Sequence, residues 1–451
     1  MATSTSSPTV PSPQLARALI RSLTRGTSIS AGVRFLHVGH SRWLAAQYEL
    51  LDELKDDGHA DTKFVRGDYG AGKSHFLSVV QDHARHTGWM TSHVECKVDG
   101  VQIDRFETLY SKLAAKLTAD EFRSADGLST PANVVRVLLD RWTASLLKKV
   151  GVDLNGLKRP FDAEERAYLE LNRGILRSNL PPEFTKALAV YLRATLSNDL
   201  DTQLAITSWL QGHETRIRVP DHYLHKPALG PKRSTSFFEI RPVGTGTARE
   251  VMRGLLWMIR AAGFNGLVLC IDEIEEIAKL GSRRREDQAL QALRDFIDNA
   301  GSEVGFDHFC MYLAATPAMF ENAEYFPRYD ALATRIQPIG TEINWRAPVV
   351  NLDKTPLQPG ELRQVGMKIR TVYDAAYSDG PAASLSDETI TKFVDEVTKS
   401  RFRVGKPRLL ARSLVDELER ARQCDHRYIP LADPGRAVQQ AAEKIAKEAN
   451  G

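Results

Sequence analysis

The chain has 451 residues, of which 42% are hydrophobic and 26% charged, so it can form about two or three domains with buried cores. Its 60 Lys and Arg against 57 Asp and Glu leave a formal charge of +3, too near balance to argue alone for a nucleic-acid or membrane partner. No apolar run approaches the roughly 20 residues of a membrane span, and the four cysteines form no C-x-x-C pair. We therefore expect a cytoplasmic protein without a disulfide framework, a zinc site or a membrane contact. The start of the chain, where Glu49 is the first acidic residue, also fits an organelle transit peptide.

The N-terminal part predicts helices followed by a strand-loop-helix unit. A Ser/Thr/Pro-rich tail, 1–14, is expected to be disordered. Helical spacing of apolar residues then covers Leu15–Leu23 and Trp43–Leu54. The segment "KFVRGDYGAGKSHFLSVVQDHA" predicts a short strand, a glycine loop and a helix, and the alternating "SHVECKVD" predicts a second strand.

The rest of the chain predicts a helical insert between the two halves of an α/β core. Helical periodicity continues from Asp104 to Gly230, without a strong strand signal, so 104–230 is expected to be the insert. The apolar run Leu267–Ile271 and the segment "FCMYLAATPAMF" are typical of strands buried on both faces of a parallel sheet. We expect the core in 15–103 and 231–347, and a C-terminal helical block in 348–451.

A complete phosphate-loop pattern, G-x-x-x-x-G-K-[ST], runs from Gly67 to Ser74. Glycines let backbone N–H groups point at phosphate oxygens, Lys73 reaches the β and γ phosphates, and the Ser74 hydroxyl binds Mg²⁺. The alternative is a structural glycine turn that carries a lysine. The residues expected to bind the nucleotide are Gly67, Asp68, Tyr69, Gly70, Ala71, Gly72, Lys73, Ser74 and His75.

Two acids follow the apolar run and complete the expected site. Asp272 would hold Mg²⁺ with Ser74, and Glu273 would act as general base for the attacking water. The alternative is that acids simply follow a strand where it reaches solvent. Because the chain has no N-K-x-D or T-K-x-D tetrad for reading guanine, we expect ATP and Mg²⁺ as the ligands.

Three further polar residues are candidates for charge stabilisation. Thr316 ends a strand that would lie beside the Asp272 strand, although it also suits a helix cap before a proline. Arg335 is a candidate arginine finger for a neighbouring subunit, with Arg328 as a substitute, and a solvated arginine is the alternative. Arg408 opens a C-terminal helix, where its charge is unfavourable to the helix dipole, so we expect a functional role.

The order of these parts resembles that of AAA+ ATPases, and within them the origin-recognition and initiator-like branch. The resemblance rests on a phosphate loop, an Asp-Glu strand, a polar strand end, an arginine, and a helical block opened by Gly-x-Pro-Arg. It implies an AAA+ type parallel sheet flanked by helices, with a C-terminal helical lid. It also implies that Thr316 is sensor 1, Arg408 is sensor 2 and Arg335 is a finger acting in trans within a homo-oligomer.

A narrower resemblance is to the ATP-binding proteins of BREX phage-defence islands, the family that includes BrxD. It rests on "FLHVGHSRWL", "VRGDYGAGKSHFL", "AITSWLQG", "GLVLCIDEIEEI", "LRDFIDNA" and "LAATPAMF…YDALATRI", which occur in this order. It departs at His75, where the family often has Phe or Leu. The resemblance implies a role in prokaryotic antiviral defence, alongside a helicase or methyltransferase.

DNA is an expected partner, although the supporting sequence signal is limited. Basic clusters occur at 281–287, near Lys232 and from Lys399 onward, and each also fits a solvated face. Three functions stay open: an ATP-hydrolysing motor or switch that acts on DNA or a DNA-bound complex, a nucleotide-gated adaptor with slow turnover, and a signalling ATPase whose insert recognises a phage protein.

Overall fold

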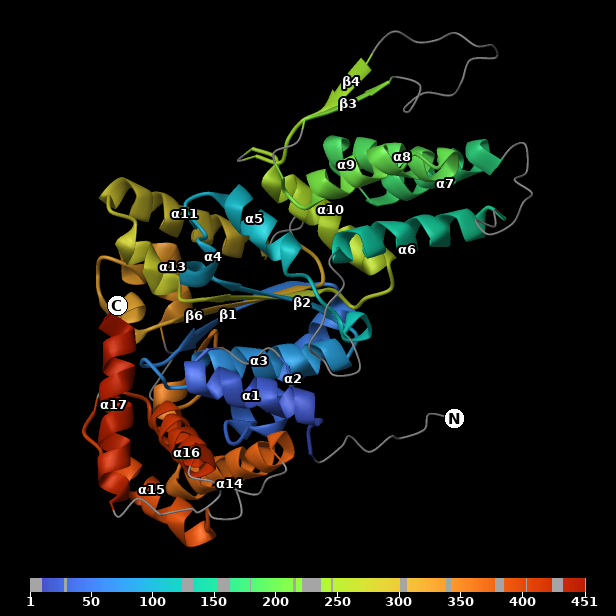
Figure 1. Cartoon of the computed structure of the whole chain (residues 1–451). Helices are drawn as coiled ribbons and strands as arrows, with labels where there is room; N and C mark the ends of the chain where they lie inside the picture. Colours follow the sequence, from blue (N-terminus) through green and yellow to red (C-terminus); the bar gives the residue numbers. More distant parts are fainter. Residues whose placement is uncertain are drawn as a thin grey trace.

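The centre of the computed structural model is a five-stranded parallel sheet with the strand order β2-β5-β6-β1-β7 (Figure 1). The strands are β1 (Ala60–Arg66), β2 (Met90–Glu95), β5 (Leu267–Asp272), β6 (Phe309–Ala315) and β7 (Val349–Asn351). The structure describes residues 10–27, 31–123, 133–151, 163–178, 180–213, 216–220, 237–244, 246–300, 306–337, 342–377, 385–402, 404–423 and 433–450. The predicted α/β class is confirmed.

Helices cover both faces of this sheet, which explains why every residue of β5 and β6 is buried. Leu267, Leu269 and Ile271 point into one core and Val268 and Cys270 into the other, as strand alternation requires. The predicted buried strands are therefore confirmed. The first core includes α5 (Phe106–Ala115), α10 (Ala248–Ala261), α11 (Arg283–Ala300), α12 (Pro317–Glu321) and α13 (Asp330–Ile336), and the second includes α2 (Ser41–Asp57) and α3 (Lys73–His86).

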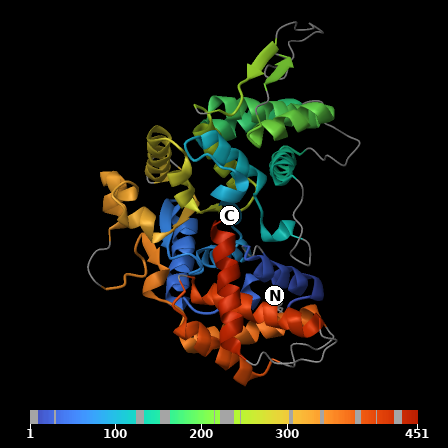
Figure 2. The same ribbon diagram turned by 60° about the vertical axis from the view of Figure 1, so that its left-hand side comes forward.

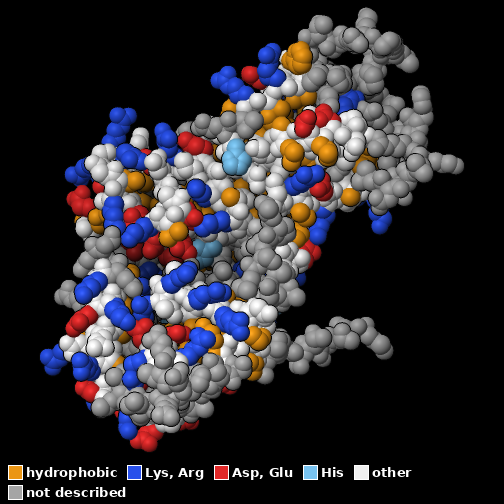
Figure 3. Space-filling view, viewed as in Figure 1, with side chains coloured by type: hydrophobic (Ala, Val, Ile, Leu, Met, Phe, Trp, Pro, Cys, Tyr) orange, Lys and Arg blue, Asp and Glu red, His pale blue; other side chains and the backbone are white. Residues whose placement is uncertain are grey.

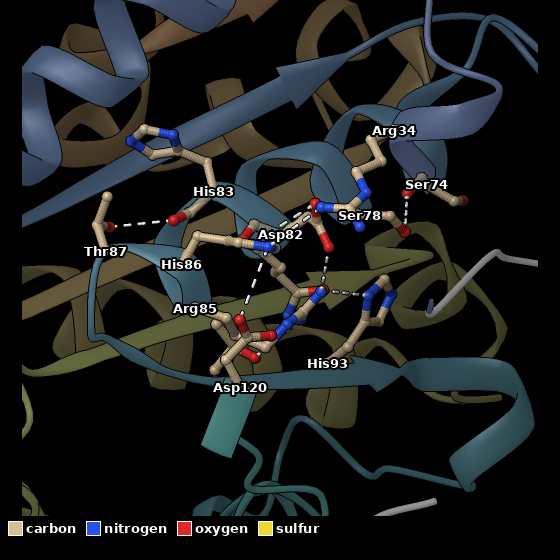
Figure 4. Close-up of polar contacts among 12 residues, drawn as sticks. Arg34, Ser74, Ser78, Asp82, His83, Arg85, His86, Thr87, His93 and Asp120 are labelled. Carbon is tan, nitrogen blue, oxygen red and sulfur yellow. Dashed lines mark hydrogen bonds and ion pairs between the residues drawn. The ribbon is translucent and has the colours of Figure 1, made fainter. Parts of the chain in front are cut away.

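Polar contacts fix α3 against β2 and against the 3₁₀ turn η2 (Asp120–Phe122). The guanidinium of Arg85 donates to Thr91 on β2 at 3.2 Å and to Asp82 on its own helix at 3.2 Å. The ring of His86 lies 3.7 Å from Asp120 (Figure 4). These contacts hold the C-terminal end of α3 against the sheet, and the phosphate loop lies at its other end.

The segment between α5 and α10 extends from one end of the sheet and includes a short pair of antiparallel strands (Figures 1 and 2). Only helices were predicted up to Gly230, so β3 is a correction. Ile217 and Val219 are buried while Arg218 is exposed, but four residues give too short an alternation to stand out. The elements between α5 and α10 are α6 (Val134–Lys149), α7 (Ala163–Ser178), α8 (Pro182–Ser197), α9 (Leu200–Leu210), β3 (Ile217–Pro220) and β4 (Phe237–Ile240).

Two more strand predictions need correction. The second predicted strand, "SHVECKVD", ends at Glu95, and Cys96–Asp99 form the short helix α4. The Glu95 N–H donates to the Asp99 carboxylate at 2.8 Å, and this local bond turns the chain out of the sheet. In the predicted helical block beyond Pro348, β7 is a strand because it pairs with β1.

Helices at the two ends of the chain pack together on the second core. The helix α1 (Pro13–Arg25) contacts α14 (Pro359–Ala376) and α16 (Lys406–Gln423), and Arg17 Nε donates to the Ala376 carbonyl at 3.0 Å. The predicted helices near the N-terminus are thus confirmed, while most of the predicted tail, 1–9, lies outside the described residues. No helix of the described part is long and apolar enough to cross a membrane. The C-terminal helices are α14 (Pro359–Ala376), α15 (Asp387–Lys399), α16 (Lys406–Gln423) and α17 (Pro434–Asn450).

Candidate nucleotide-binding site

The candidate site lies at the carboxyl ends of β1, β5 and β6. The helix after β1, α3, covers one face of the sheet, whereas the helices after β5 and β6 cover the other face. In open parallel sheets, such a reversal between neighbouring strands leaves a crevice at the carboxyl edge where ligands bind. On the face shown in Figure 3, Asp and Glu side chains gather beside α13.

The loop between β1 and α3 has the geometry that its glycines allow. Gly70 has a φ of +81° and Gly72 a φ of +102°, a region that disfavours residues with a Cβ. Lys73 Nζ donates to the Gly67 carbonyl at 2.9 Å and to the Asp68 carbonyl at 3.3 Å. The ammonium group therefore lies folded over the loop, and the predicted strand-loop-helix unit is confirmed.

Ser74 and Asp272 meet although they are 198 residues apart in sequence. The Ser74 hydroxyl donates to the Asp272 carboxylate at 2.5 Å, and the other oxygen of Asp272 accepts the Glu273 N–H at 2.8 Å. Asp272 is only 2% exposed. The adjacent hydroxyl and carboxylate oxygens fit Mg²⁺, which proteins bind through one or two carboxylates together with substrate phosphates.

Glu273 occupies an unusual backbone conformation at the end of β5. Its φ is +59°, which is rare for a residue with a side chain and is often found at functional sites. Burial raises the pKa of its carboxyl group, and the neighbouring carboxylates of Asp272 and Glu95 raise it further. Its Oε2 atom is buried and has no hydrogen-bond partner among the described residues. The Glu273 carboxylate thus has one acceptor atom to which no group of the described residues donates a hydrogen bond.

Glu275, for which the sequence pattern predicts no role, lies in the 3₁₀ helix η4 (Ile274–Lys279) that follows Glu273. Burial raises the pKa of its carboxyl group, while its own backbone N–H, the Lys73 ammonium and the Thr316 N–H oppose that rise. The run "DEIEE" at 272–276 contains two acids beyond Asp272 and Glu273. Where their side chains lie depends on the turn at Glu273, which the sequence does not reveal.

A pocket of about 400 Å³ opens near the start of α3. It is lined by His37, by α2 residues such as Tyr48, and by Lys368 of α14. His37 Nδ1 lies 3.4 Å from Nε2 of His75, the residue after Ser74. Burial lowers the pKa of His37 to about 4 and that of His75 to about 3, so both rings are neutral at pH 7. The only sequence signal for this pocket is the segment "FLHVGHSRWL", which by itself indicates no binding role.

The C-terminal helices reach the phosphate loop through the start of α16. The Gly405 N–H donates to the Tyr69 carbonyl at 3.0 Å, and the Arg408 guanidinium lies 4.7 Å from the centre of the Tyr69 ring. Thr316 lies at the end of β6, beside β5 as expected. It precedes α12, but its side chain makes no capping hydrogen bond to that described helix.

The candidate arginine finger is only partly described. Arg335 lies in α13, and its side chain falls outside the described residues. The substitute candidate is Arg328. Its guanidinium forms an ion pair with Asp287 of α11 at 2.5 Å, so its charge is compensated within the chain.

The predicted basic clusters are partly occupied by internal ion pairs. Arg285 pairs with Asp104 at 3.0 Å and Arg283 with Glu324 at 3.1 Å. Lys399 pairs with Glu396 in the third cluster. The cluster near Lys232 lies outside the described residues.

Comparison with protein families identifies the family to which the chain belongs. The model of one family, described as BREX system ATP-binding protein BrxC/D, matches residues 12–430. The chain belongs to this family. The predicted resemblance to the BREX ATP-binding proteins is thereby confirmed, and the phosphate loop, Asp272 and the His37 pocket all lie within the BrxC/D match. No curated protein matches the chain.

Proposed function

We propose that the protein is a cytoplasmic ATPase of a prokaryotic, BREX-type antiphage defence system, and that it binds ATP with Mg²⁺ at 67–74. The contact of 2.5 Å between Ser74 and Asp272 is the observation that carries this proposal. It joins the phosphate loop to a buried acid, the pair of groups that Mg²⁺-dependent phosphoryl transfer requires. The family description favours ATP as the nucleotide.

Each residue has a defined task in the proposed reaction. Lys73 leaves its two loop carbonyls to contact the β and γ phosphates, with the loop N–H groups around it. Mg²⁺, held by Ser74 and Asp272, would neutralise phosphate charge. Glu273 accepts a hydrogen bond from the attacking water as general base, and Thr316 contacts the γ phosphate. The pocket at His37 would receive the base, because His37 lies 3.4 Å from His75, the residue directly after the loop.

ATP turnover by the purified chain tests this function. We expect Mg²⁺-dependent release of phosphate, and Glu273→Gln should lower kcat by roughly 10²–10⁴ while ATP still binds. Glu276→Gln is the matched control, because Glu276 pairs with Lys279 at 2.6 Å in the same turn. Absence of turnover by the wild-type protein would refute the enzymatic proposal.

We propose DNA, or a protein complex bound to DNA, as the target of this hydrolysis, with a helicase or methyltransferase of the same defence system as partner. DNA should then stimulate turnover, and the stimulation should fall with salt. If the protein binds ATP but turns over negligibly with and without DNA, it is instead a nucleotide-gated adaptor. Turnover that a phage protein stimulates and DNA does not would indicate the signalling function.

We also propose that the protein works as an AAA+ type homo-oligomer in which Arg335 completes a neighbour's site. The domain arrangement would be the predicted one, with an insert at 104–230 and a helical lid at 348–451. Lys73→Ala and Arg335→Ala should each be inactive alone. Mixing the two variants should restore part of the turnover, because some interfaces combine an intact loop with an intact arginine. No recovery at any ratio would contradict the trans arrangement.

A further inference from the structure

Two acids, Glu273 and Glu275, follow β5, whose neighbours in the sheet are β2 and β6. On one side, Glu273 is close to Glu95, which ends β2 and pairs in register with Asp272. On the other side lies β6, whose Leu313 pairs with Ile271 and which ends just before Thr316. The turn at Glu273, with its φ of +59°, brings η4 back against β6.

The surroundings of Glu275 are those of the phosphate-binding side. Its carboxyl group lies near the Lys73 ammonium and the Thr316 N–H, the two groups expected nearest the γ phosphate. The charged neighbours that act most strongly on Glu273 are all carboxylates. Glu275 thus lies beside the loop, and its carboxylate in turn acts on that of Glu273.

Both carboxyl groups have one buried oxygen that lacks a donor. The Oε2 atoms of Glu273 and Glu275 have no hydrogen-bond partner among the described residues. Buried acceptors in native proteins are normally paired, with protein groups or with water. One water molecule carries two O–H groups, so a single water that reaches both oxygens can donate to both acids.

We propose that Glu275 is a second catalytic carboxylate, which holds the attacking water together with Glu273. This inference rests on the proposed ATP hydrolysis. In the reaction step, the water oxygen forms a bond to the γ phosphorus while its O–H bond breaks and the proton passes to one of the two carboxylates. The bond between the γ phosphorus and the β–γ bridging oxygen breaks, and the electron pair leaves with ADP. The products are ADP and inorganic phosphate, and the proton then returns to solvent.

The test compares kcat and the dissociation constant for ATP in the wild type, E273Q, E275Q, E276Q and the double variant E273Q/E275Q. We expect E275Q to lower kcat by about 10² or more, as removal of a general base does, with ATP affinity changed less than about threefold. The double variant should be little slower than the slower single variant, because both acids act on one water. E276Q should match the wild type.

Several results would overturn the inference. These are a kcat of E275Q within about twofold of wild type, a loss that appears only in ATP affinity, or single-variant losses that multiply in the double variant. If E275Q does not fold, Glu275→Asp, which keeps the charge but withdraws the carboxylate, must lower kcat at unchanged affinity. An inactive wild type would refute the proposed function itself, whereas a normal E275Q beside an inactive E273Q refutes only this inference.

Discussion

Gly405 gives the sharpest structural prediction, because it packs directly on the phosphate loop. A Cβ on Gly405 would lie 2.0 Å from the Gly70 carbonyl oxygen, 2.1 Å from the Gly70 carbonyl carbon and 2.7 Å from the Ala71 nitrogen. All three are backbone atoms, so Gly405→Ala must displace the loop or the start of α16. Overpacking of this kind costs about 1–3 kcal/mol, and loss of the Gly405 N–H bond to Tyr69 costs about 1 kcal/mol more.

Gly405→Ala is therefore expected to cost about 2–4 kcal/mol in total, divided between the free energy of unfolding and the free energy of ATP binding. Each 1.4 kcal/mol that falls on binding weakens ATP affinity about tenfold. The assays are denaturant unfolding and nucleotide titration. Gly360→Ala is the control, because a Cβ there meets nothing within 4 Å. If Gly405→Ala unfolds at the same denaturant concentration as Gly360→Ala and binds ATP equally well, the contact between the loop and the start of α16 has no energetic importance.

Two further predictions concern the metal ligand and the pocket. Ser74→Ala should raise the Mg²⁺ concentration for half-maximal turnover at least severalfold, since it removes one of the two proposed protein ligands; an unchanged Mg²⁺ titration would contradict that role. His37→Asn should make the free energy of unfolding fall less steeply as the pH is lowered. Burial, chiefly, lowers the pKa of His37 to about 4 from 6.5, so its stabilising contribution is complete above pH 6.5 and declines as the pH falls toward 4. The contribution of His37 to the free energy of unfolding can fall by at most about 1.4 kcal/mol for each pH unit. Unfolding free energies measured between pH 4.5 and 7 should fall less steeply in the variant, and parallel curves would argue against this origin.

Local signals in the sequence were sufficient to predict the central elements of the fold. The glycine spacing before Lys73 and the unbroken apolar run Leu267–Ile271 each specify their own conformation, and both were confirmed. In contrast, β7 has three residues and is a strand because β1 lies beside it, as shown by the Phe64 N–H bond to the Pro348 carbonyl at 2.8 Å. Periodicity over three residues cannot reveal such a partner.

The same distinction holds for the candidate site. Proximity of Ser74 and Asp272 was predictable because the carboxyl ends of parallel strands share one edge. The position of Glu275 was not, because it depends on a left-handed turn at Glu273 that the residue type does not favour. The contact between Tyr69 and Gly405 depends on how α16 docks, which follows from packing of the whole helical block.

The place of β1 in the sheet also governs when the site can form during synthesis. Both neighbours of β1 come late in the chain, since β6 spans Phe309–Ala315 and β7 spans Val349–Asn351. The phosphate loop is therefore made early, but the strand that supports it has no pairing partner in this sheet until the ribosome has passed the insert. Such non-local pairing slows folding and leaves strand edges exposed to aggregation. A nascent chain of this protein should accordingly acquire its nucleotide affinity only near the end of translation.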